Sequence, residues 1–196
     1  MNGIQLASSR EANQYLADEP LALLIGMLLD QQIPIEKAFT SPYVLRERLG
    51  HDLDAREIAS YDPEAFEQLF RQPPALHRFP AAMAKRVQQL GQVLVERYDG
   101  DPETVWRLSA DGDDLVRRIG ELPGFGSQKA RIFTALLGKQ LGVRPSGWRE
   151  ATAPFGEAGA FRSVADVVDD ASLAKVRAYK QQMKAEVKAA AGDHVR

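Results

Sequence analysis

The chain has 196 residues, of which 44% are hydrophobic and 27% are charged, a composition typical of a globular protein. It contains no cysteine, which excludes disulfides, iron–sulfur clusters and cysteine nucleophiles, and no stretch approaches the ~20 apolar residues of a membrane-spanning helix. The net charge of −2 argues mildly against a strongly basic nucleic-acid-binding protein, although backbone amides can bind phosphates without any lysine. No secretory signal pattern is visible, and the expected location is the cytoplasm.

The first half of the sequence predicts a series of helices separated by prolines. A short helix is expected over residues 8–17, with Ser8 or Ser9 as its N-cap. The stretch from Pro20 to residue 29 is apolar on all sides, which indicates a central buried helix. The other helices expected in this half cover residues 35–39, 43–49, 54–60, 62–71 and 81–98, with Pro42 separating the first two.

A glycine-rich turn, Leu-Pro-Gly-Phe-Gly over residues 122–126, follows in the second half. Apolar residues recur at helical spacing on both sides of it, which predicts two helices joined by a tight hairpin. Amide groups of such a turn, next to the start of a helix over 128–138, favour an anion. An ordinary connection between two helices is the alternative.

After residue 142 the pattern changes to loops, a short element over 163–169 and a long helix over 172–191. That helix carries an apolar stripe and several lysines, which makes this end of the chain locally basic. Strand alternation and internal repeats are absent from the sequence. The predicted fold class is therefore all-α.

Two motifs, in this order along the chain, resemble a known family. The buried helix ends in Leu-Leu-Asp-Gln-Gln over residues 28–32, and the later turn reads Leu-Pro-Gly-Phe-Gly. The pair resembles the helix–hairpin–helix–GPD superfamily of base-excision DNA repair glycosylases, which includes endonuclease III, and more narrowly its small cysteine-free bacterial branch. The resemblance implies a two-lobed fold. Residues 20–142 would form a helical barrel lobe with the hairpin, and residues 1–19 with 143–196 a second helical lobe with a basic C-terminal helix.

The resemblance also implies roles for residues in both motifs. Gln32 is expected to enter the gap that an extruded base leaves in the duplex, and the hairpin is expected to bind the DNA backbone. The carbonyls of Leu122 and Phe125 are compatible with a bound sodium or potassium ion. No other cofactor and no side-chain metal site are expected, because the histidines lack a metal-binding spacing. The residues expected at the DNA are Gln31, Gln32, Leu122, Gly124, Phe125, Gly126, Ser127, Gln128 and Lys129.

The chain departs from the family at the lysine nucleophile of bifunctional members. That lysine would stand two positions after the second hairpin glycine, where this chain has Gln128. Lys129 is one residue further on, and it should point elsewhere because each residue rotates ~100° around a helix. We therefore expect no Schiff-base lyase activity, whereas glycosylase activity does not need a lysine at this position.

The family's catalytic aspartate, which would fall near residues 146–148, is also missing. A fixed carboxylate in a dry site stabilises the positive charge that develops on the sugar. Glu150 and Asp30 are the two candidates to supply it. The alternatives are a surface helix residue for Glu150 and a loop carboxylate for Asp30.

The leading hypothesis is a base-excision DNA repair protein. It would act as a monomer on double-stranded DNA and hydrolyse the N-glycosidic bond of a damaged or mispaired base, as a monofunctional DNA glycosylase. A second hypothesis is a non-catalytic DNA-binding or lesion-sensing protein that kept the hairpin and lost the lysine and aspartate. A hairpin used for protein contacts alone is the third.

Overall fold

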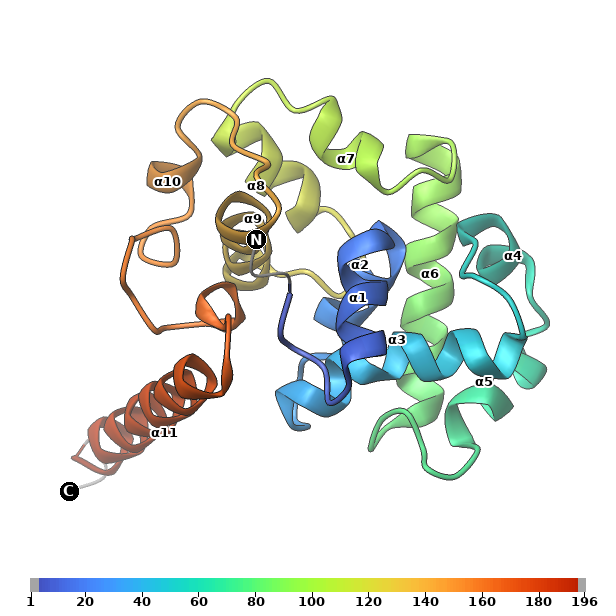
Figure 1. Cartoon of the computed structure of the whole chain (residues 1–196), viewed down its shortest axis with the longest axis horizontal. Coiled ribbons are helices and arrows are strands. Elements are labelled where there is room, and N and C mark those ends of the chain that lie inside the picture. The colour runs from blue at the N-terminus through green and yellow to red at the C-terminus, as the bar shows by residue number, and fades with distance from the viewer. Residues whose placement is uncertain (1–3, 194–196) are drawn as a thin grey trace.

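The computed structural model describes residues 4–193, with side chains described through residue 189. Within this range the protein consists of α-helices, one short 3-10 helix and loops, without a strand, as the sequence predicted (Figure 1). None of these helices is long and apolar enough to cross a membrane. The elements are α1 (Arg10–Asp18), α2 (Pro20–Leu29), α3 (Ile35–Leu49), α4 (Ala55–Ser60), α5 (Pro63–Arg71), α6 (Pro80–Tyr98), α7 (Glu103–Arg107), α8 (Gly112–Gly120), α9 (Ser127–Gln140), α10 (Trp148–Ala151), η1 (Val164–Asp166) and α11 (Asp170–Asp193).

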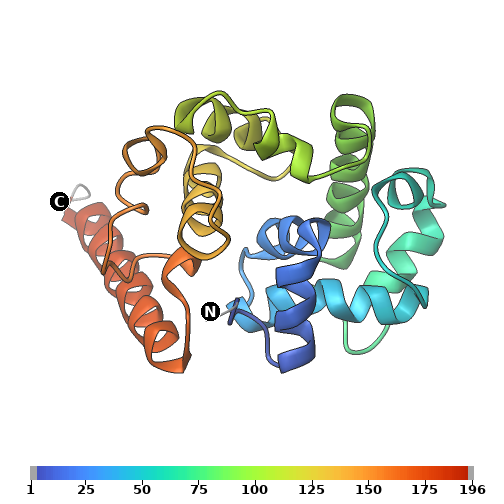
Figure 2. The ribbon, with the colours of Figure 1, turned by 45° about the horizontal axis from the view of Figure 1, so that its top comes forward.

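Helices α1 to α6 pack together on one side of the molecule, where α2 packs on α1, α3 and α6 (Figures 1 and 2). Every residue of α2 after Pro20 is buried, which agrees with its uniformly apolar sequence. The starts of three surrounding helices are fixed by side-chain caps: Ser9, Asp54 and Asp62 each accept a backbone N–H of the first turn. The buried helix predicted from the sequence is thus the centre of this group.

Helices α8 to α11 form the other side, and α7 leads across to them from α6 (Figure 2). α8 and α9 pack against each other and are joined by the turn over residues 121–126. The segment after α9 folds back over both helices. Trp148 fills a notch at Gly112 and Gly138, where an added Cβ would lie 2.5 Å from it. One apolar core runs continuously through both groups of helices.

The structure corrects the prediction at Pro42. Two short helical runs were expected on either side of this proline, but α3 is one helix that contains it. Proline supplies no N–H to the helix. Ser41, directly before it, donates its hydroxyl to the carbonyl of Lys37 at 2.7 Å and also lies 2.8 Å from the carbonyl of Leu76. The tertiary packing of α3 on α2 accompanies the continuous helix.

The first helix and the segments after residue 142 each pack on neighbouring helices of the middle of the chain. α1 packs mainly on α2 and α3, while α8 and α9 pack on α10 and η1. Tyr15 connects α1 to the loop between α3 and α4, because its hydroxyl accepts the N–H of Leu53 at 3.1 Å. Residues 1–3 and 194–196 of the predicted second lobe lie outside the described residues.

The last helix, α11, is only half packed. Leu173 and Val176 at its start are buried, whereas Met183 and Val187 further along the predicted stripe are 39% and 67% exposed. Its start contacts η1, Arg177 and Lys180 reach Glu36 and Asp30, and the far end of the helix extends beyond the rest of the molecule (Figure 1). The second half of the helix therefore presents its side chains, including lysines, to solvent.

Candidate nucleic-acid interface

The two sequence motifs meet at Leu28, in the last turn of α2. Its carbonyl accepts two side-chain donors, Nε2 of Gln31 at 2.9 Å and Nζ of Lys129 at 3.1 Å. The last carbonyls of a helix have no partner within the helix, so these donors act as a C-terminal cap. The turn before α9 also packs here, because a Cβ on Gly124, whose φ is +85°, would lie 3.0 Å from Leu28 Cγ. The structure thus places the loop after α2 beside the hairpin turn.

The two glutamines of this loop have different environments. The amide of Gln31 is held on both sides: Nε2 also contacts Sδ of Met83 at 3.4 Å, and Oε1 accepts from Nη1 of Arg86 at 3.3 Å. Gln32 is exposed, and its side chain makes no hydrogen bond to any described residue. Its φ of +57° lies in the left-handed region, which is strained for a residue other than glycine. Of the pair, only Gln32 has a side chain free to reach a ligand.

His77 braces this loop from the other side. The N–H of Phe79 donates to Nδ1 of His77 at 3.1 Å, so Nε2 carries the proton and donates to the carbonyl of Gln31 at 3.0 Å. The imidazole is 1% exposed. The structure therefore gives His77 a structural role at this loop.

The His77 brace predicts a stability that depends on pH. Burial lowers the pKa of His77 below its ordinary value of 6.5, and the nearby charges of Lys37 and Arg78 act in the same direction. Between the folded and unfolded pKa values the unfolded chain binds the extra proton, so stability falls as the pH drops below about 6.5. We expect the melting temperature to decrease between about pH 7 and pH 5. The decrease should be smaller in His77→Gln, which removes the buried imidazole. A His77→Gln variant with the wild-type pH profile would contradict this assignment.

Asp30, the residue between α2 and the glutamines, lies among cations. Its side chain is 11% exposed, and Oδ2 is 3.8 Å from Nζ of Lys180 in α11. Burial lowers the pKa of Lys129 to about 8, an effect that the negative charge of Asp30 opposes. Gln128 is exposed, so it and Lys129 point in different directions, as the helical rotation predicted. What the sequence did not indicate is that Lys129 would turn toward the end of α2.

The start of α9 offers free backbone amides. Its N-cap is Gly126, without a side-chain hydrogen bond and without an acidic residue in the first turn. The N–H groups of Ser127, Gln128 and Lys129 make no hydrogen bond to any described residue, as expected of the first turn of a helix. These amides and the helix dipole favour an anion. An added Cβ on Gly126 would meet no atom within 4 Å, so the space beyond it is open.

The apolar residues of the hairpin face inward. Leu122 and Phe125 are 2% and 4% exposed, and the ring of Phe125 packs edge-on against Phe133 with 5.7 Å between centroids. Their side chains anchor the turn, so any ligand would meet the backbone of these residues. The carbonyl of Leu122 accepts the N–H of Phe125 at 3.1 Å.

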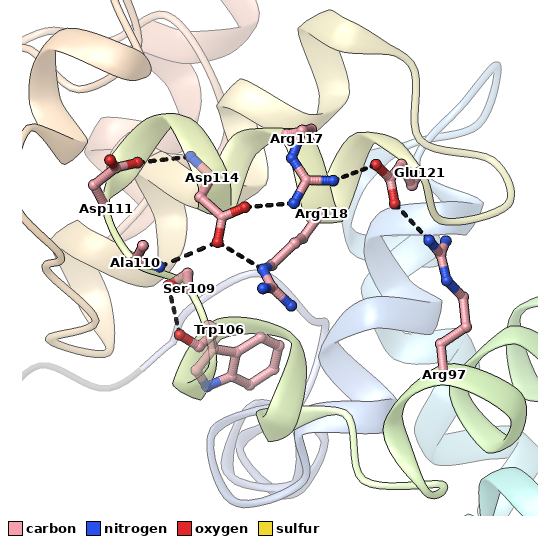
Figure 3. Close-up of polar contacts among 9 residues, drawn as sticks. All are labelled: Arg97, Trp106, Ser109, Ala110, Asp111, Asp114, Arg117, Arg118 and Glu121. Atoms are coloured by element: carbon pink, nitrogen blue, oxygen red, sulfur yellow. Dashed lines mark hydrogen bonds and ion pairs between the residues drawn. The ribbon is translucent and has the colours of Figure 1, made fainter.

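The arginines of α8 are bound to acids (Figure 3). Arg117 and Arg118 both contact Asp114, and Arg117 also reaches Glu121, which in turn accepts from Arg97 of α6 at 2.8 Å. The Arg118 guanidinium, together with the N–H of Ala110 and Arg117, holds the pKa of Asp114 well below its usual range. This network ties α8 to the end of α6 and neutralises the arginines of α8. An anion at the turn would therefore be bound mainly by backbone amides.

A cleft of about 770 Å³ opens beside the loop after α2. Its walls are the loop itself, Arg78, and one face of α11. The residues that line it are Asp30, Gln31, Gln32, Ile33, Pro34, Ile35, Arg78, Arg177, Lys180, Gln181 and Lys184. We call it the α11 cleft. It contains Gln32, whose side chain is exposed.

Glu150, the second predicted carboxylate, lies elsewhere. It is exposed on α10, which packs on α8 and α9, and its side chain makes no hydrogen bond or ion pair with any described residue. Among the described residues, no cluster of three His, Asp or Glu side chains is suited to a metal ion. The site thus combines Asp30, Gln32, Lys129 and the start of α9, without Glu150.

No protein-family model matches the chain, and no curated protein is detectably similar to it in sequence. The candidate interface therefore depends on the two motifs and on the geometry described above. Sequence reasoning missed the cleft residues Arg78 and Arg177 and the contact of Lys129 with Leu28. Arg177 could have been found from its spacing, since residues 177, 180, 181 and 184 share one face of a helix.

Proposed function

We propose that this chain is a member of the helix–hairpin–helix–GPD superfamily and a DNA repair protein that acts on a damaged or mispaired base in double-stranded DNA. The observation that carries this proposal is the meeting of the two motifs at Leu28. Gln31, next to the exposed Gln32, and Lys129, in the first turn of α9, both donate to the carbonyl of Leu28. This shared acceptor places Gln32 near the free amides of α9. A base-extruding protein needs these two functions side by side, because it must hold a bent backbone and fill the gap in the stack.

In this proposal each part of the interface has a separate role. The amides of Ser127, Gln128 and Lys129 bind a backbone phosphate, which positions the duplex without reading its sequence. Gln32 enters the duplex, where a planar amide can stack and hydrogen-bond. A carbonyl oxygen has two lone pairs, so the bond that Leu122 accepts leaves it able to contact a sodium or potassium ion, together with the carbonyl of Phe125. The two-lobed architecture, a monomeric state and a cytoplasmic location belong to the same proposal.

The proposed reaction is hydrolysis of the N-glycosidic bond. Water supplies oxygen to C1′ of the sugar and a proton to the departing base, and the sugar carries positive charge in the transition state. Asp30 is the favoured carboxylate to stabilise that charge, because it borders the α11 cleft beside Gln32. Gln128 at the usual lysine position is unable to form a Schiff base, so no strand cleavage by lyase chemistry is expected.

The second candidate function is a lesion-sensing protein that binds DNA without hydrolysing it. The position of Asp30 favours it: Lys180 lies 3.8 Å away, and the amine of Lys129 is also near. These two cations would offset part of the negative charge of Asp30, which is needed to stabilise the positive charge on the sugar. Glu150, on α10, offers no replacement at this place.

Purified wild-type protein should be incubated with duplexes that each carry one deaminated, alkylated, oxidised or mispaired base, and abasic sites should be developed with alkali. We expect alkali-dependent cleavage of at least one duplex, no cleavage without alkali, and no protein–DNA adduct after borohydride reduction. Tight binding of one lesion duplex without cleavage would support the lesion-sensing function. Equal and weak affinity for every duplex, damaged or not, would contradict both.

A further inference from the structure

A second charged surface lies apart from the hairpin. Four cationic side chains line the α11 cleft, those of Arg78, Arg177, Lys180 and Lys184, against the single carboxylate of Asp30. Three of them come from one face of α11. Because a helix rises 1.5 Å per residue, residues 177 and 184 are about 10 Å apart along the axis. Successive charges of one DNA strand are about 3.4 Å apart along its axis, so this row can reach more than one phosphate.

Two of these cations are bound to acids of the loop and of α3. Arg177 forms an ion pair with Oε1 of Glu36, and Lys180 lies 3.8 Å from Oδ2 of Asp30. The cations are the more exposed partners: the side chains of Arg177 and Lys180 are 51% and 39% exposed, against 26% for Glu36 and 11% for Asp30. A ligand in the cleft can therefore approach the cations from the solvent side, where it competes with the acids for them.

The carboxylates of Glu36 and Asp30 contact Arg177 and Lys180 where the phosphate of a ligand would contact them. Oε2 of Glu36 is buried and has no hydrogen-bond partner among the described residues, so the carboxylate depends on Arg177 for its compensation. The cation of each pair is the exposed partner, so a polyanion that offers several charges at once can compete with the acids for Arg177 and Lys180. Arg78 and Lys184 form no ion pair with a described residue, so they are available from the start.

We propose that the α11 cleft is a second binding surface for the DNA backbone, and that Glu36 and Asp30 hold Arg177 and Lys180 when DNA is absent. This inference rests on the proposed function, since the occupant is the duplex that Gln32 enters. The location of Gln32 within the same cleft favours DNA over an acidic protein. α11 thereby acts as a clamp that contacts the backbone away from the hairpin.

The test is the salt dependence of duplex binding, measured by fluorescence anisotropy with a short fluorescein-labelled undamaged duplex between about 50 and 200 mM salt. Each lost phosphate contact reduces the steepness of the slope of log affinity against log salt by ~0.9. The double variant Arg177→Ala/Lys180→Ala should therefore show a slope that is less steep by close to ~1.8, the value for two contacts. Arg56→Ala/Arg71→Ala is the matched control, because it removes the same charge from α4 and α5, far from α11 (Figure 1). Glu36→Gln releases Arg177 and should bind about two- to five-fold more tightly, the factor of an exposed ion pair.

The outcomes separate this inference from the proposed function. If Arg177→Ala/Lys180→Ala bound the duplex with the same salt slope as the wild type, the α11 cleft would not be a DNA-binding surface. An equal reduction of the slope in the control variant would lead to the same conclusion. Either result would leave the proposed binding at the start of α9 unaffected. Tighter binding by Glu36→Gln supports the α11 cleft as a DNA-binding surface, provided that the melting temperature shows a folded protein; weaker binding by the folded variant counts against it. Preference for single-stranded RNA or an acidic peptide over the duplex would also overturn it. No wild-type binding at any salt concentration would overturn both.

Discussion

The Gly126→Asp variant should fold and lose its affinity for duplex DNA. Gly126 is the N-cap of α9 with φ −82° and ψ 175°, a conformation open to any residue, and an added Cβ would meet no atom within 4 Å. Aspartate is a favourable N-cap, so the melting temperature should stay the same or rise. Its charge, however, would stand where the phosphate is proposed to bind. Juxtaposed like charges cost several kcal/mol, which corresponds to at least about 100-fold weaker binding.

Gly126→Asn is the matched control for this variant. It has the same size and caps the helix in the same way, but it is neutral, so it should lose much less affinity than the aspartate. Anisotropy titrations of both variants and a thermal melt of each would give the comparison. If Asp and Asn weakened binding equally, or if neither did, the phosphate would not bind at the start of α9.

The Asp30→Asn variant should separate chemistry from binding. Asp30 is the proposed carboxylate for the sugar cation, and loss of one preorganised electrostatic group typically slows catalysis by about 10²–10³-fold. The same change frees Lys180, which lies 3.8 Å from Oδ2. We therefore expect the variant to bind the duplex at least as tightly as the wild type while its single-turnover rate falls.

The control for this experiment is Glu150→Gln. Glu150 is exposed on α10, and its side chain has no hydrogen bond or ion pair with a described residue, so the rate should not change. The measurement is a single-turnover time course on whichever lesion duplex the wild-type protein cleaves. An Asp30→Asn rate equal to the wild type, or a slow Glu150→Gln, would move the catalytic role away from Asp30.

Sequence patterns predicted the helices well where a local signal marks them. Ser9, Asp54 and Asp62 cap helices at the expected places, and the stretch after Pro20 is the buried centre that its composition indicated. The pattern misled at Pro42, because the break that proline causes was prevented by tertiary packing, which single residues do not reveal. The exposed half of α11 escaped prediction for a similar reason, since an apolar stripe does not say whether anything covers it.

The candidate site was predictable only in part. Motif order identified Gln32 and the hairpin, and helical rotation separated Gln128 from Lys129. The contact of Lys129 with Leu28 joins residues 101 positions apart, and no local pattern encodes such a pair. The α11 cleft likewise depends on how a C-terminal helix lies against a loop near the N-terminus. The sequence supplied candidates, and only the fold could bring them together.

The carbonyl of Leu28 joins two segments that lie far apart in the sequence. It accepts both the amide of Gln31 and the amine of Lys129, so one oxygen connects the loop that carries Gln32 to the first turn of α9. Movement of either donor changes the electrostatic environment of the other. Displacement of either segment would therefore disturb the other through this one shared oxygen.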